Sequence, residues 1–145
     1  IRDRFEEKKI VCVTGDGSFG FNAMEIDTAV KNNSNICVII SNNGGWNIEK
    51  HDQRLNYGNR VYATSLAHSD YAALAKSLGA YGVRVEDPEK LEQALSEALN
   101  NTPSVVDVIT SSTILSSDAT KGLGFVPKYQ ALDVWDDMEI EFRKK

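Results

Sequence analysis

Short apolar runs alternate with amphipathic stretches along most of this chain. The apolar runs are rich in β-branched residues, as strands buried on both faces of a parallel sheet are, and the amphipathic stretches repeat their apolar residues at helical spacing. The pattern predicts strands at 10–14, 36–41, 82–85 and 105–110, and helices at 21–33, 70–78 and 88–99. This order predicts an α/β fold, a doubly wound parallel sheet flanked by helices.

Two segments do not fit the alternation. Residues 42–60 are rich in asparagine, glycine and charge, and they predict a long loop with a short helix at 46–53. A loop of this length in a compact domain is usually functional or disordered. Residues 111–145 carry aromatic side chains, including Trp135, and a charged end. We therefore predict an α/β domain at 1–110 and a tail at 111–145 that packs on the same or a neighbouring domain.

The composition is that of a globular chain, with 145 residues, 41% of them apolar, and a net charge of −5. The acidic balance argues against a nucleic-acid partner, and no apolar run is long enough to predict a membrane span. The chain begins at Ile1 with neither an initiator methionine nor a signal-peptide pattern, so we expect that upstream sequence is missing. Cys12 and Cys37 each lie in a predicted strand without metal-ligand spacing, which predicts two buried thiols in a reducing cytoplasm.

A glycine-rich segment, Gly15 to Gly20, follows the first predicted strand and fits the dinucleotide pattern G-x-G-x-x-G. That fingerprint also needs a carboxylate after the next strand, where this chain has Asn42-Asn43 instead. Asp16 would repel a pyrophosphate unless a cation lay between them. A nucleotide P-loop is excluded because no Gly-Lys-Ser/Thr follows the glycines.

A magnesium ion resolves both difficulties, because it prefers oxygen ligands and often binds through one or two protein groups plus phosphates. Asp16 would supply a carboxylate, the end of the neighbouring strand an amide oxygen, and the following loop a backbone carbonyl. The N–H groups of Ser18 and Phe19, at the start of the predicted helix at 21–33, would hold phosphates from the other side.

Gly15-Asp16-Gly17, followed after 24 residues by Asn42-Asn43, resembles the thiamine-diphosphate-binding motif, which runs from GDG to NN. The resemblance covers essentially all of the chain. It extends to the diphosphate-binding domain of the acetolactate synthase, benzaldehyde lyase and oxalyl-CoA decarboxylase group. It includes the segments at 59–61, 69–71, 75–79 and 121–123.

This resemblance implies a magnesium site made by Asp16, Asn43 and the carbonyl of Gly45. It implies a wider set of residues along thiamine diphosphate: Gly15, Asp16, Gly17, Ser18, Phe19, Asn43, Gly45, Trp46, Asn47 and Ile48. The glutamate that activates the cofactor belongs, in this family, to a pyrimidine-binding domain of the same or a partner subunit. We therefore assign no catalytic residue here and expect a C-terminal part of a longer chain, in a homodimer or homotetramer.

The resemblance favours an acetolactate-synthase-like enzyme that decarboxylates and joins 2-oxo acids. Acetolactate synthases, however, typically have Gly-Met and then Trp where this chain has Asn47, Ile48 and Asp52. Gly44-Gly45 resembles the acyl-CoA decarboxylase and lyase branch. A 2-oxo acid decarboxylase or 2-hydroxyacyl-CoA or benzaldehyde-type lyase is therefore the first alternative, and a non-catalytic α/β module is the second.

Three further side chains leave their roles open. His51 is interpreted as a solvent-exposed loop residue, with an acid/base group as the alternative. His68, just before a predicted helix, is interpreted as structural or exposed. Trp46 either faces the cofactor or anchors its loop to the core.

Overall fold

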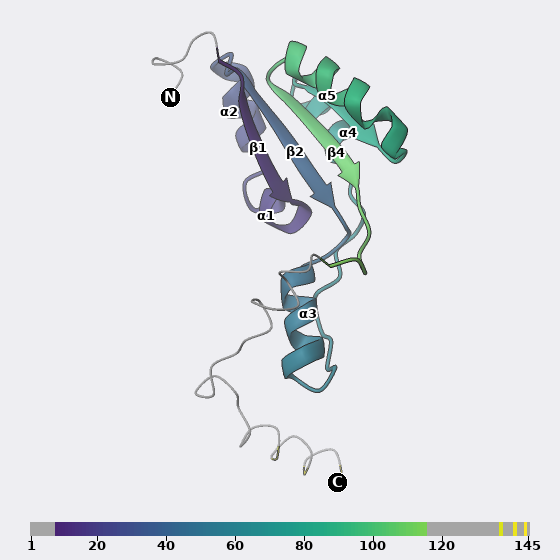
Figure 1. Cartoon of the computed structure of the whole chain (residues 1–145). Coiled ribbons are helices and arrows are strands. Elements are labelled where there is room, and N and C mark those ends of the chain that lie inside the picture. The colour runs from purple at the N-terminus through teal and green to yellow at the C-terminus, as the bar shows by residue number, and fades with distance from the viewer. Residues whose placement is uncertain (1–7, 116–136, 138–140, 142–143, 145) are drawn as a thin grey trace. The chain divides into compact units, whose positions relative to one another are not determined.

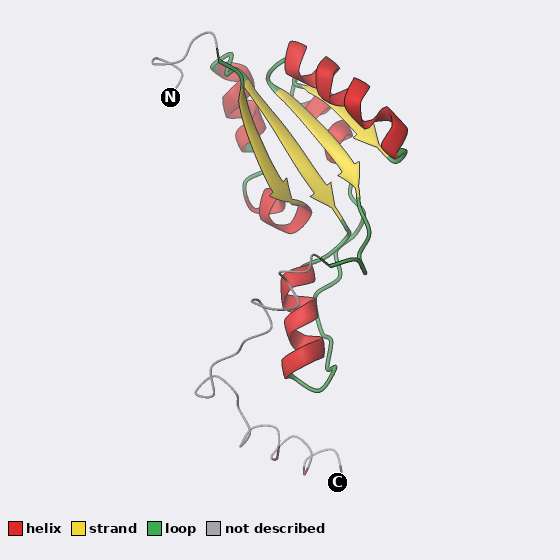
Figure 2. Cartoon of the chain, viewed as in Figure 1, coloured by secondary structure: helices red, strands yellow, loops and turns green. Residues whose placement is uncertain are grey.

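The computed structural model describes residues 8–115, 137, 141 and 144 (Figure 1). Most of the predicted tail at 111–145, with Trp135 and the segment at 121–123, lies outside these residues. The elements in chain order are β1 (Ile10–Gly15), α1 (Asp16–Phe21), α2 (Glu25–Lys31), β2 (Ile36–Asn42), α3 (Asn47–Asn56), α4 (Tyr71–Ser77), β3 (Tyr81–Val85), the 3-10 helix η2 (Pro88–Lys90), α5 (Leu91–Asn100) and β4 (Ser104–Ile109) (Figure 2).

The chain divides into two compact units. The first comprises Ile1–Trp46 and Ser65–Ser112 and holds the sheet, and the second comprises Asn47–Thr64 and Thr113–Lys145 and holds α3. Within the second unit, the Gln53 side chain pairs with the backbone of Tyr62. Its Oε1 accepts from the Tyr62 N–H at 2.8 Å, and its Nε2 donates to the Tyr62 carbonyl at 3.2 Å.

The sheet has four parallel strands in the order β1-β2-β4-β3. The order is not sequential, so helical crossovers connect the strands, as in other doubly wound sheets. Because the strands are parallel, their carboxyl ends share one edge, and Gly15 of β1 pairs there with Ser41 of β2. The predicted fold class is confirmed.

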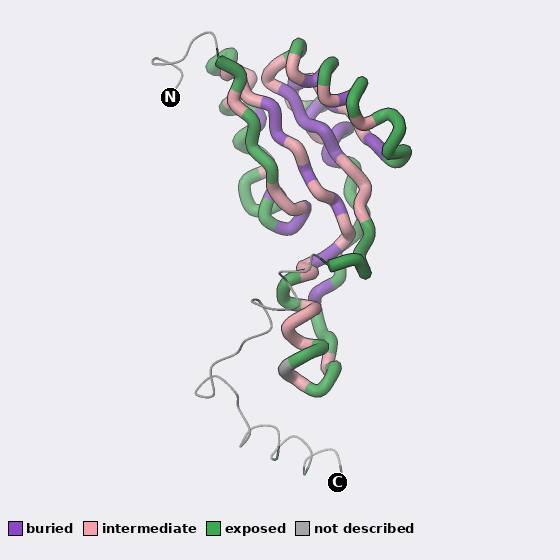
Figure 3. Tube along the Cα trace, viewed as in Figure 1, coloured by how far each residue is buried: buried purple, intermediate pink, exposed green. Residues whose placement is uncertain are grey.

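The core occupies both faces of the sheet, and the central strands β2 and β4 are its most buried part (Figure 3). Successive strand residues point to opposite faces, so Val38 and Val105 enter one cluster while Cys37 and Val106 enter the other. The first cluster also includes residues of α1, α2 and α4, and the second includes residues of α5. Helices therefore pack on both faces of the sheet, but on the face of the second cluster Val11 and Val13 of β1 remain 48% and 72% exposed.

The helix predicted at 21–33 is wrong in its start and in its continuity. Helix α1 begins at Asp16, immediately after β1, and ends at Phe21, and Asn22 leaves helical geometry at φ −132° and ψ 26° before α2 begins. Glycine has low helix propensity, so a segment with two glycines does not look helical. In the fold, the burial of Asp16 and Phe19 holds it in place. Ser18 and Phe19 therefore lie inside the first helix rather than before it.

Three other local expectations can be compared with the structure. The short helix predicted at 46–53 is a ten-residue helix, α3. The helix predicted at 70–78 is α4, which Asp70 caps by accepting from the Ala73 N–H at 2.8 Å and which Gly79 follows with φ +87°. The expectation of two buried thiols is wrong for Cys12, because β1 is an edge strand of the described sheet and Cys12 is exposed, whereas Cys37 is buried.

None of the helices in the described residues is long and apolar enough to cross a membrane.

Candidate cofactor and metal site

Asp16 lies at the carboxyl edge of the sheet, at the point where β1 becomes α1. Its side chain is buried, with 1% of the residue exposed, and its Oδ2 accepts a hydrogen bond from the backbone N–H of Gly45 at 3.1 Å. Gly45 follows β2, the strand that pairs with β1. The pairing of these strands therefore brings together two of the three predicted metal-binding residues, which are 29 positions apart in the sequence.

Asn43, the third of them, comes directly after β2. Its side-chain Oδ1 is buried, and no hydrogen bond to it is found within the described part of the chain. A buried amide oxygen without a partner is costly, and native proteins usually satisfy it with a polar group, water or an ion. An amide oxygen, a carboxylate and a backbone carbonyl are also the hard oxygen donors that Mg²⁺ prefers. The residues present therefore fit the predicted magnesium ion.

The loop that carries Asn43 and Gly45 depends on the glycine between them. Gly44 has φ +69°, a conformation that residues with a Cβ rarely adopt. A Cβ at Gly44 would lie 2.5 Å from Cε1 of His68, so the imidazole rests directly against this backbone. The Gly44 carbonyl also accepts from the Leu66 N–H at 2.9 Å. His68 is exposed and packs on the loop, in agreement with its interpretation from the sequence.

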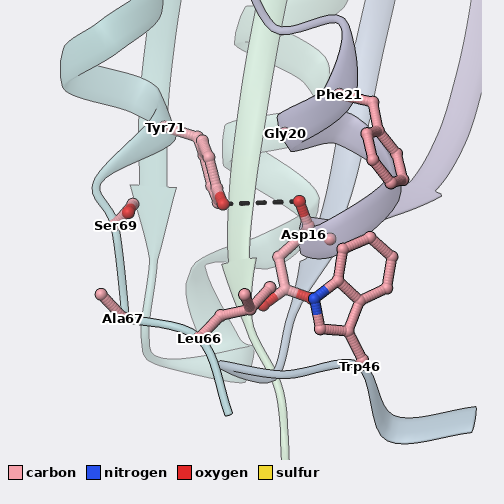
Figure 4. Close-up of a pocket in the computed structure, with 9 residues that line it drawn as sticks. Asp16, Gly20, Phe21, Trp46, Leu66, Ala67, Ser69 and Tyr71 are labelled. Atoms are coloured by element: carbon pink, nitrogen blue, oxygen red, sulfur yellow. Dashed lines mark hydrogen bonds between the residues drawn. The ribbon is translucent and has the colours of Figure 1, made fainter. Parts of the chain in front are cut away.

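A cavity of about 300 Å³ lies beside Asp16 (Figure 4). Its lining residues all belong to the first unit and are Asp16, Gly17, Gly20, Phe21, Trp46, Leu66, Ala67, Ser69 and Tyr71. The α1 segment and the backbone before α4 thus form opposite walls (Figure 4). The cavity opens at the carboxyl edge of the sheet, where ligands of doubly wound folds bind.

Trp46 both lines this cavity and packs on α1, so the two interpretations of its role do not exclude each other. Its indole lies beside Asp16 in Figure 4. A Cβ at Gly17 would come within 2.9 Å of the indole Cε3, which explains the glycine at this position. The ring also contacts Phe21, with the two ring centroids 5.2 Å apart and the planes tilted by 51°.

Tyr71 is a site residue that the sequence did not single out. It begins α4, and its hydroxyl donates to the backbone carbonyl of Asp16 at 3.4 Å (Figure 4). Its ring packs edge-on against Phe19, with the ring centroids 5.2 Å apart. Burial and then the negative charge of Asp16 raise the pKa of Tyr71, which keeps the hydroxyl protonated as a donor. Its signals in the sequence were its place at the start of the predicted helix at 70–78 and within the segment at 69–71 that carries the family resemblance.

Asp107 on β4 is a second buried carboxylate that the sequence did not single out. It has no exposed surface and accepts three hydrogen bonds. The donors are Asn42 Nδ2 at 2.9 Å, the Tyr71 backbone N–H at 3.1 Å and Arg84 Nη1 at 3.1 Å. Arg84 also pairs with Glu86 at 2.9 Å, and hydrogen bonding to Glu86, followed by the charge of Asp107, raises the Arg84 pKa.

Four other residues predicted to lie along the cofactor do not line the cavity: Ser18, Phe19, Asn47 and Ile48. Ser18 is exposed on α1, whereas the Phe19 side chain lies in the core, so only its backbone remains to face a ligand. Asn47 and Ile48 begin α3 in the second unit, whereas the residues that line the cavity belong to the first. His51 is also in α3 rather than in a loop, and it is partly buried, so its interpretation as a solvent-exposed loop residue is wrong.

Comparison with known proteins agrees with this geometry. The model of the family described as "Thiamine pyrophosphate enzyme, C-terminal TPP binding domain" matches residues 3–108. An acetolactate synthase large subunit from Mycobacterium tuberculosis is 37% identical over 109 residues, which cover 74% of this chain and 20% of that protein. An acetolactate synthase from Bacillus subtilis is 35% identical over 130 residues, which cover 86% of this chain and 23% of that protein.

The fold is similar to a solved structure as well. Benzoylformate decarboxylase from Polynucleobacter necessarius superimposes with a TM-score of 0.71 and 25% sequence identity, over 79% of this chain and 22% of that one. The chain thus spans about a fifth of the length of the relatives it matches. The family match covers the sheet, the glycine-rich segment and the asparagine pair together, and the chain belongs to the C-terminal thiamine-pyrophosphate-binding domain family of thiamine pyrophosphate enzymes.

Proposed function

We propose that this chain is the magnesium- and diphosphate-binding part of an acetolactate-synthase-like enzyme that decarboxylates 2-oxo acids and joins the product to an acceptor. The observation that carries the proposal is the pairing of two oxygen donors at one edge of the sheet. The carboxylate of Asp16 is buried and contacts Gly45, and the buried Oδ1 of Asn43 lacks a hydrogen-bond partner in the described chain.

In this proposal Asp16, Asn43 and the Gly45 carbonyl hold Mg²⁺, and the metal in turn holds the diphosphate. The backbone of α1 faces the same cavity through Gly17, and the first N–H groups of a helix attract phosphate oxygens. Ser18 and Phe19 contribute these N–H groups. The metal also explains how an acidic chain, with a net charge of −5, binds an anionic cofactor without a basic patch.

Thiamine diphosphate supplies the chemistry when bound, because it stabilises a carbanion next to a carbonyl carbon. The residues of this chain bind and orient its phosphate end, and Trp46 and Tyr71 shape the cavity beside it. We propose that the activating glutamate comes from a pyrimidine-binding domain of the same or a partner subunit, in a cytoplasmic homodimer or homotetramer. The length of the relatives supports this, since they are about five times longer than the part matched here.

A 2-oxo acid decarboxylase is the second candidate, and the similarity to benzoylformate decarboxylase favours it. The identity of Asn47 and Ile48 also departs from acetolactate synthases. The support for a 2-hydroxyacyl-CoA or benzaldehyde-type lyase is Gly44-Gly45 after the asparagine pair, which resembles the acyl-CoA decarboxylase and lyase branch. A non-catalytic module is the least supported, because Asp16 and Asn43, the two side-chain oxygen donors of the proposed metal site, are both present.

Calorimetric titration of the full-length protein with thiamine diphosphate and Mg²⁺ tests the binding proposal. We expect binding that requires Mg²⁺ and that is lost in Asp16→Ala but kept in Asp27→Ala, an exposed carboxylate in the first turn of α2. Absence of binding in the wild-type protein, or equal binding in Asp16→Ala, contradicts the proposal.

The reaction is tested by product analysis after incubation with pyruvate. Acetolactate supports the synthase, acetaldehyde alone supports the decarboxylase, and the absence of turnover points to lyase substrates. Binding and turnover are measured on the same preparation, so that a failure of the reaction is not mistaken for a failure of cofactor binding.

A further inference from the structure

The buried carboxylate of Asp107 has no role in the binding site as proposed, because it does not line the cavity. We propose that Asp107 is the positioning residue of the metal site: it fixes Asn42 so that the next residue, Asn43, presents its Oδ1 to the metal. This inference rests on the proposed function. It concerns a residue that acts through its neighbours and touches neither cofactor nor substrate.

The contacts of Asp107 come from three different elements. Asn42 ends β2, Tyr71 begins α4 and Arg84 lies on β3, and each donates a hydrogen bond to the same carboxylate. A carboxylate that has lost a proton only accepts hydrogen bonds, so it suits a site where every neighbour is a donor. Arg84 supplies the charge that balances a fully buried anion, at 3.1 Å. Asp107 and its three donors therefore form a specific hydrogen-bonded cluster around a buried charge.

Asn42 connects this cluster to the metal site. Its Nδ2 donates to Asp107 at 2.9 Å and to the Ser69 carbonyl at 3.1 Å, which ties the end of β2 to the backbone before α4. The Oδ1 atoms of Asn42 and Asn43 are both buried without a hydrogen-bond partner in the described structure, but the Asn42 side chain is fixed through the two bonds of its Nδ2. In this proposal the Nδ2 bonds of Asn42 give it the structural task, and Asn43 is the ligand.

Tyr71 provides a second connection from Asp107 to the metal site. The Tyr71 backbone N–H donates to Asp107, while the Tyr71 hydroxyl donates to the carbonyl of Asp16. The N–H belongs to the first turn of α4 and has no partner within the helix. Asp107 thus fixes the helix start from which Tyr71 reaches Asp16. The first connection ends at Asn42, the neighbour of the proposed ligand Asn43. The second ends at Asp16, which is itself a proposed ligand.

The test compares Asp107→Asn with Asp70→Ala in the full-length enzyme. The first substitution would place an NH₂ group opposite at least one of the donors. Asp70→Ala removes the exposed cap of the same helix, the hydrogen bond from Ala73 N–H, and leaves Asn42 untouched. We expect the half-saturating Mg²⁺ concentration of Asp107→Asn to rise about 10- to 100-fold, as for other partners of metal ligands. We expect kcat to recover at saturating Mg²⁺.

Asp70→Ala should lower the melting temperature but raise the half-saturating Mg²⁺ concentration much less than Asp107→Asn does, because the bonds from Asp107 to Asn42 and to the Tyr71 N–H remain. If Asp107→Asn leaves that concentration unchanged, or if Asp70→Ala raises it equally, the proposal is wrong. Should Asp107→Asn fail to fold, Asn42→Ala is the second variant, since it removes only one of the three hydrogen bonds to Asp107. An unchanged Mg²⁺ requirement in Asn42→Ala equally overturns the proposal.

A readout without cofactor separates this inference from the proposed function. Hydrogen–deuterium exchange on the apo protein reports on the segments around Asn42 and Tyr71, and we expect faster exchange in both for Asp107→Asn but only around Tyr71 for Asp70→Ala. Unchanged exchange around Asn42 contradicts the positioning role. If the wild-type protein binds no Mg²⁺ and thiamine diphosphate, the proposed function fails, while the exchange experiment still decides whether Asp107 holds Asn42.

Discussion

The backbone N–H of Gly45 donates to Oδ2 of Asp16 at 3.1 Å, so the carboxylate that we propose as a metal ligand already has a fixed partner in the chain. This contact joins the segment after β1 to the loop after β2. A ligand held in place before the metal arrives does not have to lose side-chain freedom on binding. The same contact means that Asp16 contributes to both stability and binding, and the two contributions can be separated.

Asp16→Asn and Asp16→Ala should separate them. Asparagine keeps an oxygen that accepts from the Gly45 N–H, whereas alanine leaves that buried N–H without a partner at a cost of about 1–3 kcal/mol. We expect both variants to lose Mg²⁺-dependent binding of thiamine diphosphate, and only Asp16→Ala to lose that much unfolding free energy. Urea unfolding of the apo protein and calorimetry measure the two effects. Equal stability of the two variants contradicts a structural role for the Gly45 contact.

Gly17→Ala should disturb the contact between α1 and Trp46. The added Cβ would lie 2.9–3.0 Å from three atoms of the indole, so the ring must move, at a cost of about 1–3 kcal/mol. Thermal unfolding and tryptophan fluorescence measure the change. Gly20→Ala is the matched control, because a Cβ there meets no described atom within 4 Å. In α1 that control should be neutral or stabilising, by up to about 1 kcal/mol. Equal behaviour of the two variants contradicts close packing at Gly17.

The elements that the sequence predicted well are those in which one continuous pattern decides the structure. The four strands were placed to within about one residue because each is a short run rich in β-branched residues, even where Arg84 or Asp107 interrupts it. The contact of Asp16 with the loop after β2 was predictable too, because parallel strands place their following loops at one edge. By contrast, the pattern of β1 could not show that Cys12 lies on an exposed edge, since strand order is set by all four strands together.

The parts that could not be predicted depend on partners distant in the sequence. Asp107 is a single carboxylate in an apolar strand, and its three donors are 65, 36 and 23 positions away. Nothing local distinguishes it from a solvent-facing aspartate. Helix α1 was missed for the opposite reason, since its local sequence is glycine-rich and its helical state depends on the burial of Asp16 and Phe19. Both cases lie next to the binding site, where local preference and structure are expected to disagree.

Glu97 should make a small contribution to stability that depends on pH. It accepts hydrogen bonds from Gln93 and from the Tyr81 hydroxyl, and these lower the pKa of Glu97. A carboxyl group with a lowered pKa stabilises the fold at pH values above its unfolded pKa of about 4.3, and this contribution is lost as the pH falls through the folded pKa. We therefore expect the stability difference between wild type and Glu97→Gln to shrink below about pH 4.

Urea unfolding of wild type and Glu97→Gln, at pH values from about 3 to about 7, measures this difference. Glu92→Gln is the control, because Glu92 is an exposed carboxylate on the same helix. A wild-type advantage over Glu97→Gln that stays constant or grows on acidification has the wrong sign for a lowered pKa, and it contradicts the prediction.

Gly44→Ala should be the most damaging glycine substitution in the loop that carries the proposed metal ligands. It combines two costs: the left-handed backbone at φ +69°, about 1–2 kcal/mol for a residue with a Cβ, and a clash with the His68 imidazole at 2.5 Å. Gly58→Ala isolates the first cost, because Gly58 has φ +62° and a Cβ there meets no described atom within 4 Å. Unfolding free energies of both variants, with His68→Ala alone and combined with Gly44→Ala, separate the two costs. We expect the double variant to regain the unfolding free energy that the clash costs. It should keep a loss equal to that of Gly58→Ala. If His68→Ala restores nothing, the imidazole does not constrain this loop.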